Sequence, residues 1–144
     1  MRNANIKHYQ KEAFKTRLAA ADPYQITQML MAGCVDNLTL GKAAIERQDL
    51  EAKSKHLSKS GSIIDALKMS LDMEVGGEIS DNLFALYEYM NNRILDANLE
   101  NTVEPVDEVI NLMKEIKSAW DAIPVEAREQ AFTQMEERKV ATGG

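Results

Sequence analysis

Apolar residues recur at helical spacing along four stretches of the chain, with polar and charged residues at the positions between them. These stretches predict helices at about 23–48, 50–75, 80–99 and 106–123. The links between them are short and polar, and they contain the residue types that begin or end helices. Consecutive helices with such short links pack antiparallel. The pattern therefore predicts an all-α fold, an antiparallel up-down four-helix bundle.

Particular residues mark the expected helix ends. Asp22 stands before a proline, so we expect its carboxylate to cap the first helix while the proline takes the first helical position. Gly76 and Gly77 can adopt a positive φ and are expected to close the second helix. Ser80 or Asp81 is then expected to cap the third helix, so that the second and third helices form a hairpin.

Each of the first three helices carries apolar residues on two sides. The face expected in the core consists of Ile26, Met29, Leu30, Gly33, Leu40, Gly41 and Ala44 in the first helix, of Leu57, Ser60, Ile64, Leu67 and Leu71 in the second, and of Leu83, Leu86, Tyr87, Met90, Ile94 and Ala97 in the third. The second stripes consist of Met31, Val35 and Leu38, of Ala66, Met69 and Met73, and of Phe84, Leu95 and Leu99. Three exposed stripes would exceed the apolar area usual for a soluble monomer. We expect a partner, a second copy or the N-terminal segment to cover them, unless imperfect geometry buries part of a wide helix face.

The two ends of the chain differ from the bundle. Residues 1–21 are expected to form a short N-terminal capping segment whose narrow apolar stripe includes Ile6 and Tyr9. Residues 125–144 are charged and hold few apolar residues, so a short helix or a flexible C-terminal tail is expected there. Residues 1–124 are thus expected to form one helical-bundle domain.

The net charge of −6 is distributed unevenly. Residues 1–20 hold five Lys or Arg and one Glu, whereas residues 49–144 hold 10 basic and 19 acidic side chains. An acidic body repels nucleic acid, so nucleic-acid binding is not expected. The basic segment could bind another surface or could dock on the chain's own acidic domain.

Hydropathy and cysteine content bear on the compartment. No apolar run approaches the roughly 18 residues of a membrane span, and no apolar core of a signal peptide follows the first basic residues. We expect a soluble chain without membrane insertion. Cys34 is the single cysteine, which excludes an internal disulfide and is compatible with a reducing compartment. A cytoplasmic location is therefore expected.

His56 is the strongest candidate for chemistry. Phosphotransfer domains are also four-helix bundles, and an exposed His56 with Lys59 and Ser60 nearby could accept a phosphoryl group. The alternative is a solvated helix histidine. Neither His8 nor His56 has a Glu three residues before it, so the di-iron pairing of carboxylate bundles is absent. Cys34 lacks a basic neighbour and is expected to pack in the core. The sequence predicts no enzyme, no metal and no cofactor.

Several motifs in combination resemble the FliS family of flagellar export chaperones. They are Ala21-Asp22-Pro23 before the first helix, Met29-Leu30 and Gly33 inside it, Leu71-Asp72, Glu74 and Gly76-Gly77-Glu78-Ile79 around the turn, Leu83, Leu86-Tyr87 and Tyr89-Met90 in the third helix, and then Ala97-Asn98 and Ala119-Trp120. The resemblance covers most of the chain. Met31 stands where the family usually has Tyr, and Ala20 and Asp22 stand where Thr and Ser are common.

The resemblance implies a cytoplasmic bundle that binds the disordered C-terminal segment of flagellin, prevents its premature polymerisation and delivers it to the flagellar type III export gate. Such a client would fold as it binds and would lay its apolar face on the second stripes. Our hypothesis is that the nine residues of these stripes form the client surface. Ile6 and Tyr9 match the family's N-terminal segment, which can cover apolar surface when no client is bound, and are the expected lid.

Two rival interpretations remain at this point. The first is a phosphotransfer bundle that uses His56. The second is a structural bundle whose second stripes meet in a dimer. The chaperone interpretation predicts a monomer or a weak dimer.

Overall fold

The computed structural model describes residues 6, 8, 9 and 22–141, apart from the side chains of residues 132, 135 and 139. The described part of the chain is helical and contains no strand. Its long helices are α2 (Pro23–Glu46), α3 (Leu50–Met69), α4 (Gly77–Glu100), α5 (Glu104–Asp121) and α6 (Val125–Ala141). The expected all-α class is confirmed. None of these helices combines the length and the apolar composition needed to cross a membrane.

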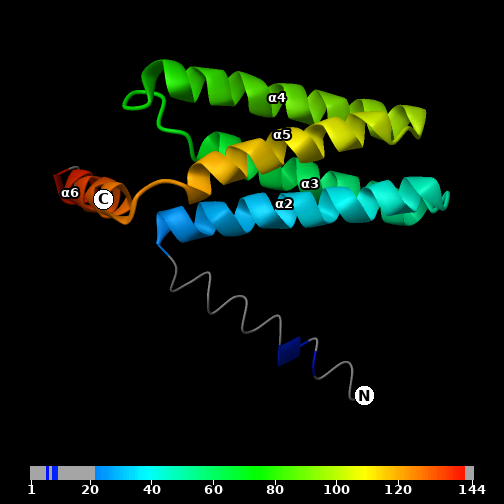
Figure 1. The fold of residues 1–144 in the computed structure, drawn as a ribbon, viewed down its shortest axis with the longest axis horizontal. Coiled ribbons are helices and arrows are strands. Elements are labelled where there is room, and N and C mark those ends of the chain that lie inside the picture. The colour runs from blue at the N-terminus through cyan, green and yellow to red at the C-terminus, as the bar shows by residue number, and fades with distance from the viewer. Residues whose placement is uncertain (1–5, 7, 10–21, 142–144) are drawn as a thin grey trace. The chain divides into compact units, whose positions relative to one another are not determined.

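The chain divides into two compact units, and residues 28–122 form the larger one. In it, α2 from residue 28 onward, α3, α4 and α5 run side by side (Figure 1). Each seam between neighbours is crossed by a polar contact: Asn37 with His56 for α2 and α3, Asp65 with Asn91 for α3 and α4, Arg93 with Glu108 for α4 and α5, and Lys42 with Asp107 for α5 and α2. The seams close a ring in chain order, as in the expected up-down bundle.

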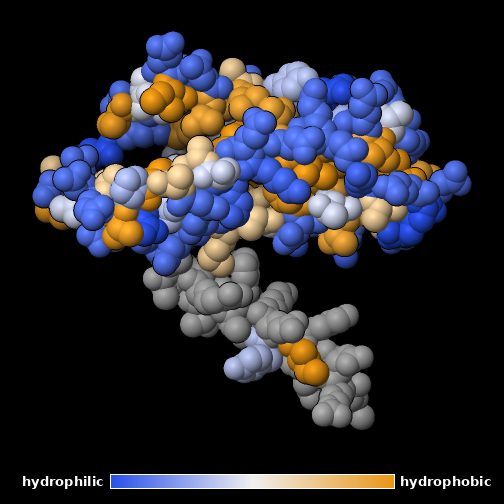
Figure 2. Space-filling view, viewed as in Figure 1, coloured by the Kyte–Doolittle hydropathy of each residue, from blue (hydrophilic) through white to orange (hydrophobic). Residues whose placement is uncertain are grey.

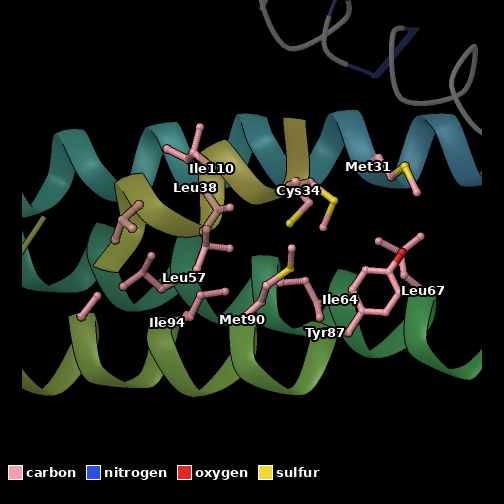
Figure 3. Packing of buried hydrophobic residues seen from close by; sticks show 14 residues of the cluster. Met31, Cys34, Leu38, Leu57, Ile64, Leu67, Tyr87, Met90, Ile94 and Ile110 are labelled. Atoms are coloured by element: carbon pink, nitrogen blue, oxygen red, sulfur yellow. The ribbon is translucent and has the colours of Figure 1, made fainter. Parts of the chain in front are cut away.

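A continuous apolar core fills the bundle (Figure 3). Its buried members are Met31, Cys34, Leu38, Leu57, Ile64, Leu67, Tyr87, Met90, Ile94, Ala97, Val106, Val109, Ile110 and Met113. The core faces expected for the second and third helices are confirmed at their central positions. Leu71, Leu83 and Leu86 lie at one end and are only half-buried.

The core face expected for the first helix is only partly right. Gly41 and Ala44 are buried as expected, but Leu40, also expected in the core, is 49% exposed. Met31 and Leu38, expected on the second stripe, are buried. The buried stripe includes Cys34, whose Sγ lies 3.9 Å from the main-chain oxygen of Ser60 in α3. Both stripes of this helix are apolar, so the fit against α3 decides which of them is buried.

The start of α2 forms as expected. The Oδ1 of Asp22 accepts a hydrogen bond from the main-chain N–H of Gln25 at 2.8 Å. The Gln25 side chain bonds back to the main-chain N–H of Asp22 at 3.4 Å, which completes a capping box. At the next link, Asp49 caps α3 by accepting from the N–H of Ala52 at 3.1 Å.

The turn between α3 and α4 differs from the prediction. α3 ends at Met69 rather than near residue 75, and α4 begins at Gly77 rather than Ser80. The main-chain oxygen of Asp72 accepts from the N–H of Gly76 and from the hydroxyl of Ser80, both at 2.9 Å, so Ser80 braces the turn instead of capping α4. Of the two glycines, only Gly77 has a positive φ, at 51°.

The second unit comprises residues 1–27 and 123–144. Its C-terminal part is the helix α6, which was one of the two outcomes expected after residue 124. Within this unit the Arg128 guanidinium lies over the ring of Tyr24, 4.3 Å from its centroid. This is the geometry of a cation–π contact.

Candidate functional site

One side of α4 borders α3. Phe84, Glu88, Asn91, Leu95 and Leu99 follow one another at intervals of three or four residues, so they share this side of the helix. Glu88 and Asn91 form polar contacts with α3: the Asn91 amide donates to Asp65 at 2.8 Å, and the Glu88 carboxylate lies 4.0 Å from the Lys68 ammonium. The other three therefore border the α3/α4 seam at its two ends.

Apolar side chains remain accessible along this seam. Leu95 and Leu99 are exposed near the end of α4, and Met69 is exposed on α3, to 84%. Phe84 is half-buried beneath the Lys68 ammonium, which lies 5.3 Å from the ring centroid. We call these four residues, together with Met73 in the following turn, the seam surface. Figure 2 shows apolar residues gathered over the first turns of α4.

The seam surface contains five of the nine residues predicted for the client surface. Ala66 is exposed on α3, but it is one residue from Asp65 and two from Lys68, so it lies on another side of the helix. The remaining three come from α2 and are not part of the seam surface. Met31 and Leu38 are 1% and 0% exposed, so their expected place on an outer stripe is wrong. Val35 is half-buried and shares its side of α2 with Lys42, which pairs with Asp107 of α5 at 2.8 Å. Val35 therefore faces the α2/α5 seam.

Two exposed apolar residues near the seam surface were missed by the sequence analysis. Val75 and Ile79 are 69% and 72% exposed, at the end of the turn and the start of α4. The predicted second helix ended at residue 75 and the third began at residue 80. Val75 was therefore the last residue of a helix and Ile79 lay in a link, and neither was assigned to an apolar stripe. The Gly76-Gly77 pair between them was the available signal, since it placed a turn there.

Ile6 and Tyr9, the predicted lid, are exposed side chains. Residues 10–21, which connect them to α2, lie outside the described residues. Their role as a lid stays a prediction.

The side chains that could take part in catalysis, those of Cys34, Tyr87 and His56, are buried or hydrogen-bonded within the bundle. Burial raises the pKa of the Cys34 thiol to about 12 and that of the Tyr87 phenol to about 12, so neither ionises at neutral pH. The Asn37 amide donates to the main-chain oxygen of Gly33 at 2.8 Å, so its oxygen accepts from Nδ1–H of the half-buried His56, 3.2 Å away. The described residues contain no cluster of His, Cys, Asp or Glu that could hold a metal ion.

Comparison with known proteins gives a consistent result. The family model described as flagellar protein FliS matches residues 4–127. The flagellar secretion chaperone FliS of Vibrio cholerae is 43% identical over 85% of this chain and 90% of its own length. FliS of Salmonella typhimurium is 39% identical over 86% of this chain and 93% of its own length. The flagellar secretion chaperone FliSB of Pseudomonas aeruginosa is 38% identical over 82% of this chain and 94% of its own length.

A solved structure has the same fold. The crystal structure of a bacterial flagellar chaperone superposes with a TM-score of 0.65, covering 78% of this chain and 94% of that one. The two sequences are 16% identical, so this likeness concerns the fold alone.

Proposed function

The chain belongs to the FliS family, and on that premise we propose that it is a cytoplasmic export chaperone for flagellin. It binds the disordered C-terminal segment of flagellin, prevents premature polymerisation and delivers the subunit to the flagellar type III export gate. The observation that carries this proposal is the similarity to proteins named flagellar secretion chaperones over most of the chain.

The seam surface is the proposed client site. A client that is disordered before binding loses conformational entropy when it folds, so it needs a long contact with apolar anchors. Exposed Leu95 and Leu99 lie at one end of the seam, and exposed Met69 lies on α3. The distance along α4 from Phe84 to Leu99 corresponds to about 22 Å at 1.5 Å per residue, which is the length of about four helical turns of a client.

The polar residues in the middle of the seam set the register of the client. Asp65, Lys68, Glu88 and Asn91 already bond to one another across α3 and α4. A client helix placed here has apolar residues near its ends and polar residues over this network. Val35 forms a separate contact, which the client reaches when it continues past α5 to the opposite seam.

Ile6 and Tyr9 act as a displaceable lid. Both are exposed apolar side chains on a basic segment, and each would lower the exposed apolar area of the acidic bundle by docking on it. The client then displaces the lid. Removal of residues 1–20 is expected to speed client association and to leave the affinity unchanged or raised, measured by stopped-flow fluorescence of a labelled flagellin segment.

Phosphotransfer is not proposed as a second function. A phosphoacceptor histidine needs a solvated imidazole, whereas His56 is half-buried with Nδ1 bonded to Asn37. The bundle is taken to be a monomer or a weak dimer. Light scattering across a concentration series distinguishes these states from a stable dimer.

The proposal is tested by calorimetric titration of the chain with the C-terminal segment of flagellin from the same organism, together with circular dichroism of the mixture. One-to-one binding with a gain of helix over the sum of the two components is expected. A scrambled segment of the same composition is the control. Absence of binding, or equal binding of the scrambled segment, would overturn the proposal.

A further inference from the structure

The turn between α3 and α4 exposes a second group of apolar residues. Met69, Met73, Val75 and Ile79 are four large exposed side chains within eleven residues, and we call them the turn patch. Met69 and Met73 also belong to the seam surface, but Val75 and Ile79 do not. Such a concentration of exposed apolar side chains is typical of an interaction site.

The turn that carries this patch is held rigidly. The Oδ1 of Asp72 accepts from the main-chain N–H of Val75 at 3.0 Å and of Glu74 at 3.2 Å. Its main-chain oxygen accepts from Gly76 and Ser80, and a Cβ at Gly76 would lie 1.7 Å from the Ser80 Oγ. The apolar side chains are therefore presented on a preorganised backbone, which lowers the entropy lost when a partner docks.

The charged side chains that follow Met69 along the chain are all acidic as far as residue 92. Residues 69–92 contain five acidic side chains and no Lys or Arg. Glu78 has a structural reason to be there, since an acidic residue in the first turn of α4 stabilises the helix dipole. Glu74 precedes the helix and has no such role. An apolar patch with an acidic rim is complementary to a segment that is both apolar and basic.

We propose that the turn patch is a second docking surface, which binds a basic amphipathic helix of a partner protein other than the flagellin segment. The apolar face of that helix covers Val75 and Ile79, and its Lys or Arg side chains lie next to Glu74 and Glu78. Because Met69 and Met73 border both surfaces, a long client and this partner compete at that border. The inference does not depend on the identity of the client.

The test uses a synthetic helical peptide with Leu on one face and Lys on the other, added to the full-length chain. Fluorescence anisotropy is expected to show binding that weakens with added salt, because the charge attraction is screened. A peptide with Glu in place of Lys is expected not to bind. Val75→Ser combined with Ile79→Ser is expected to weaken binding about tenfold or more.

Leu50→Ser is the matched control, because Leu50 is a large apolar residue at the start of α3 that is 62% exposed and belongs to neither surface. It is expected to leave binding of the Lys peptide unchanged. The combined Glu74→Gln and Glu78→Gln variant keeps the apolar patch and is expected to remove most of the salt dependence. Equal binding of the Lys and Glu peptides, or equal loss in Leu50→Ser and in the patch variant, would overturn the proposal. Both outcomes are independent of flagellin binding.

Discussion

The ammonium of Lys53, in the first turn of α3, donates a hydrogen bond to the main-chain oxygen of Asn98, near the end of α4, at 2.9 Å. It also bonds to the side-chain oxygen of Asn101, which adopts the left-handed conformation that ends α4, at φ 56°. Lys53 is 6% exposed, so this charge is buried where the carbonyl groups of α4 lack helical partners. The contact therefore joins the two helices that carry the seam surface.

Replacement of Lys53 by Met is expected to lower the free energy of unfolding by about 1–3 kcal/mol, because the main-chain oxygen of Asn98 and the side-chain oxygen of Asn101 lose their donor. Urea unfolding followed by circular dichroism measures this. Lys55→Met, at an exposed position of the same helix, is the control and is expected to change little. Equal stability of the two variants would show that the Lys53 contact does not stabilise the fold.

Most of the fold could be predicted because the spacing of the apolar residues defines the helices, and the short links between them require neighbouring helices to pack antiparallel. Asp22, which fixes the start of α2, was identifiable because its capping bonds are local. The turn after α3 was not, because Asp72 organises it through bonds to Glu74, Val75 and Ser80, and a helical pattern does not reveal such contacts. The helix therefore ends six residues earlier than the pattern indicated.

The site could be predicted only in part, for a similar reason. On α4, the face with Leu95 and Leu99 is less apolar than the core face, so the pattern separated the two. On α2, both stripes are apolar, and the burial of Met31 and Leu38 follows from how α2 meets α3. Helical periodicity describes each helix separately and cannot choose between two similar faces.

Gly41 and Gly33 of α2 provide a matched pair for the packing of α2 on α3. A Cβ at Gly41 would lie 2.7 Å from the Cδ2 of buried Leu57, whereas one at Gly33 would lie 3.7 Å from Ile63. Both Ala variants gain helix propensity, so their difference reports the overpacking. Gly41→Ala is expected to be less stable than Gly33→Ala by about 1–3 kcal/mol in thermal or urea unfolding. Equal stabilities would contradict the close contact.

Cys34 is expected to resist thiol reagents in the native state. It is fully buried, and burial raises its pKa to about 12, so almost no thiolate exists at pH 8. Labelling is expected only as fast as the bundle opens, and its rate should rise in parallel with unfolding as urea is added. The chain in strong denaturant gives the control rate. Labelling of the native chain at that rate would contradict the burial of Cys34.

Glu108 is expected to make stability depend on pH in the acid range. Its carboxylate accepts from the Tyr89 hydroxyl at 2.7 Å and from Arg93 Nε at 2.9 Å, and these contacts hold its pKa below the ordinary value of 4.5. A lowered pKa in the folded state stabilises the fold above pH 4.5, and this stabilisation is lost as the pH falls through the lowered value.

Glu108→Gln is therefore expected to be less stable than the wild type at pH 7 and to approach it at pH 3 in urea unfolding. Glu115→Gln, at an exposed position of the same helix, is the control. A stability difference for Glu108→Gln that stays constant from pH 7 to pH 3 would exclude its carboxylate as the origin.

We propose that exposed apolar residues along the α3/α4 seam hold the flagellin segment. The sharpest test is calorimetric titration of that segment into the wild type and into the Leu95→Ser and Leu99→Ser double variant, with Leu40→Ser as an exposed control on α2. The double variant is expected to bind about tenfold or more weakly, at unchanged melting temperature, while the control binds like the wild type. Equal affinity of the wild type and the double variant would show that the seam surface does not hold the flagellin segment.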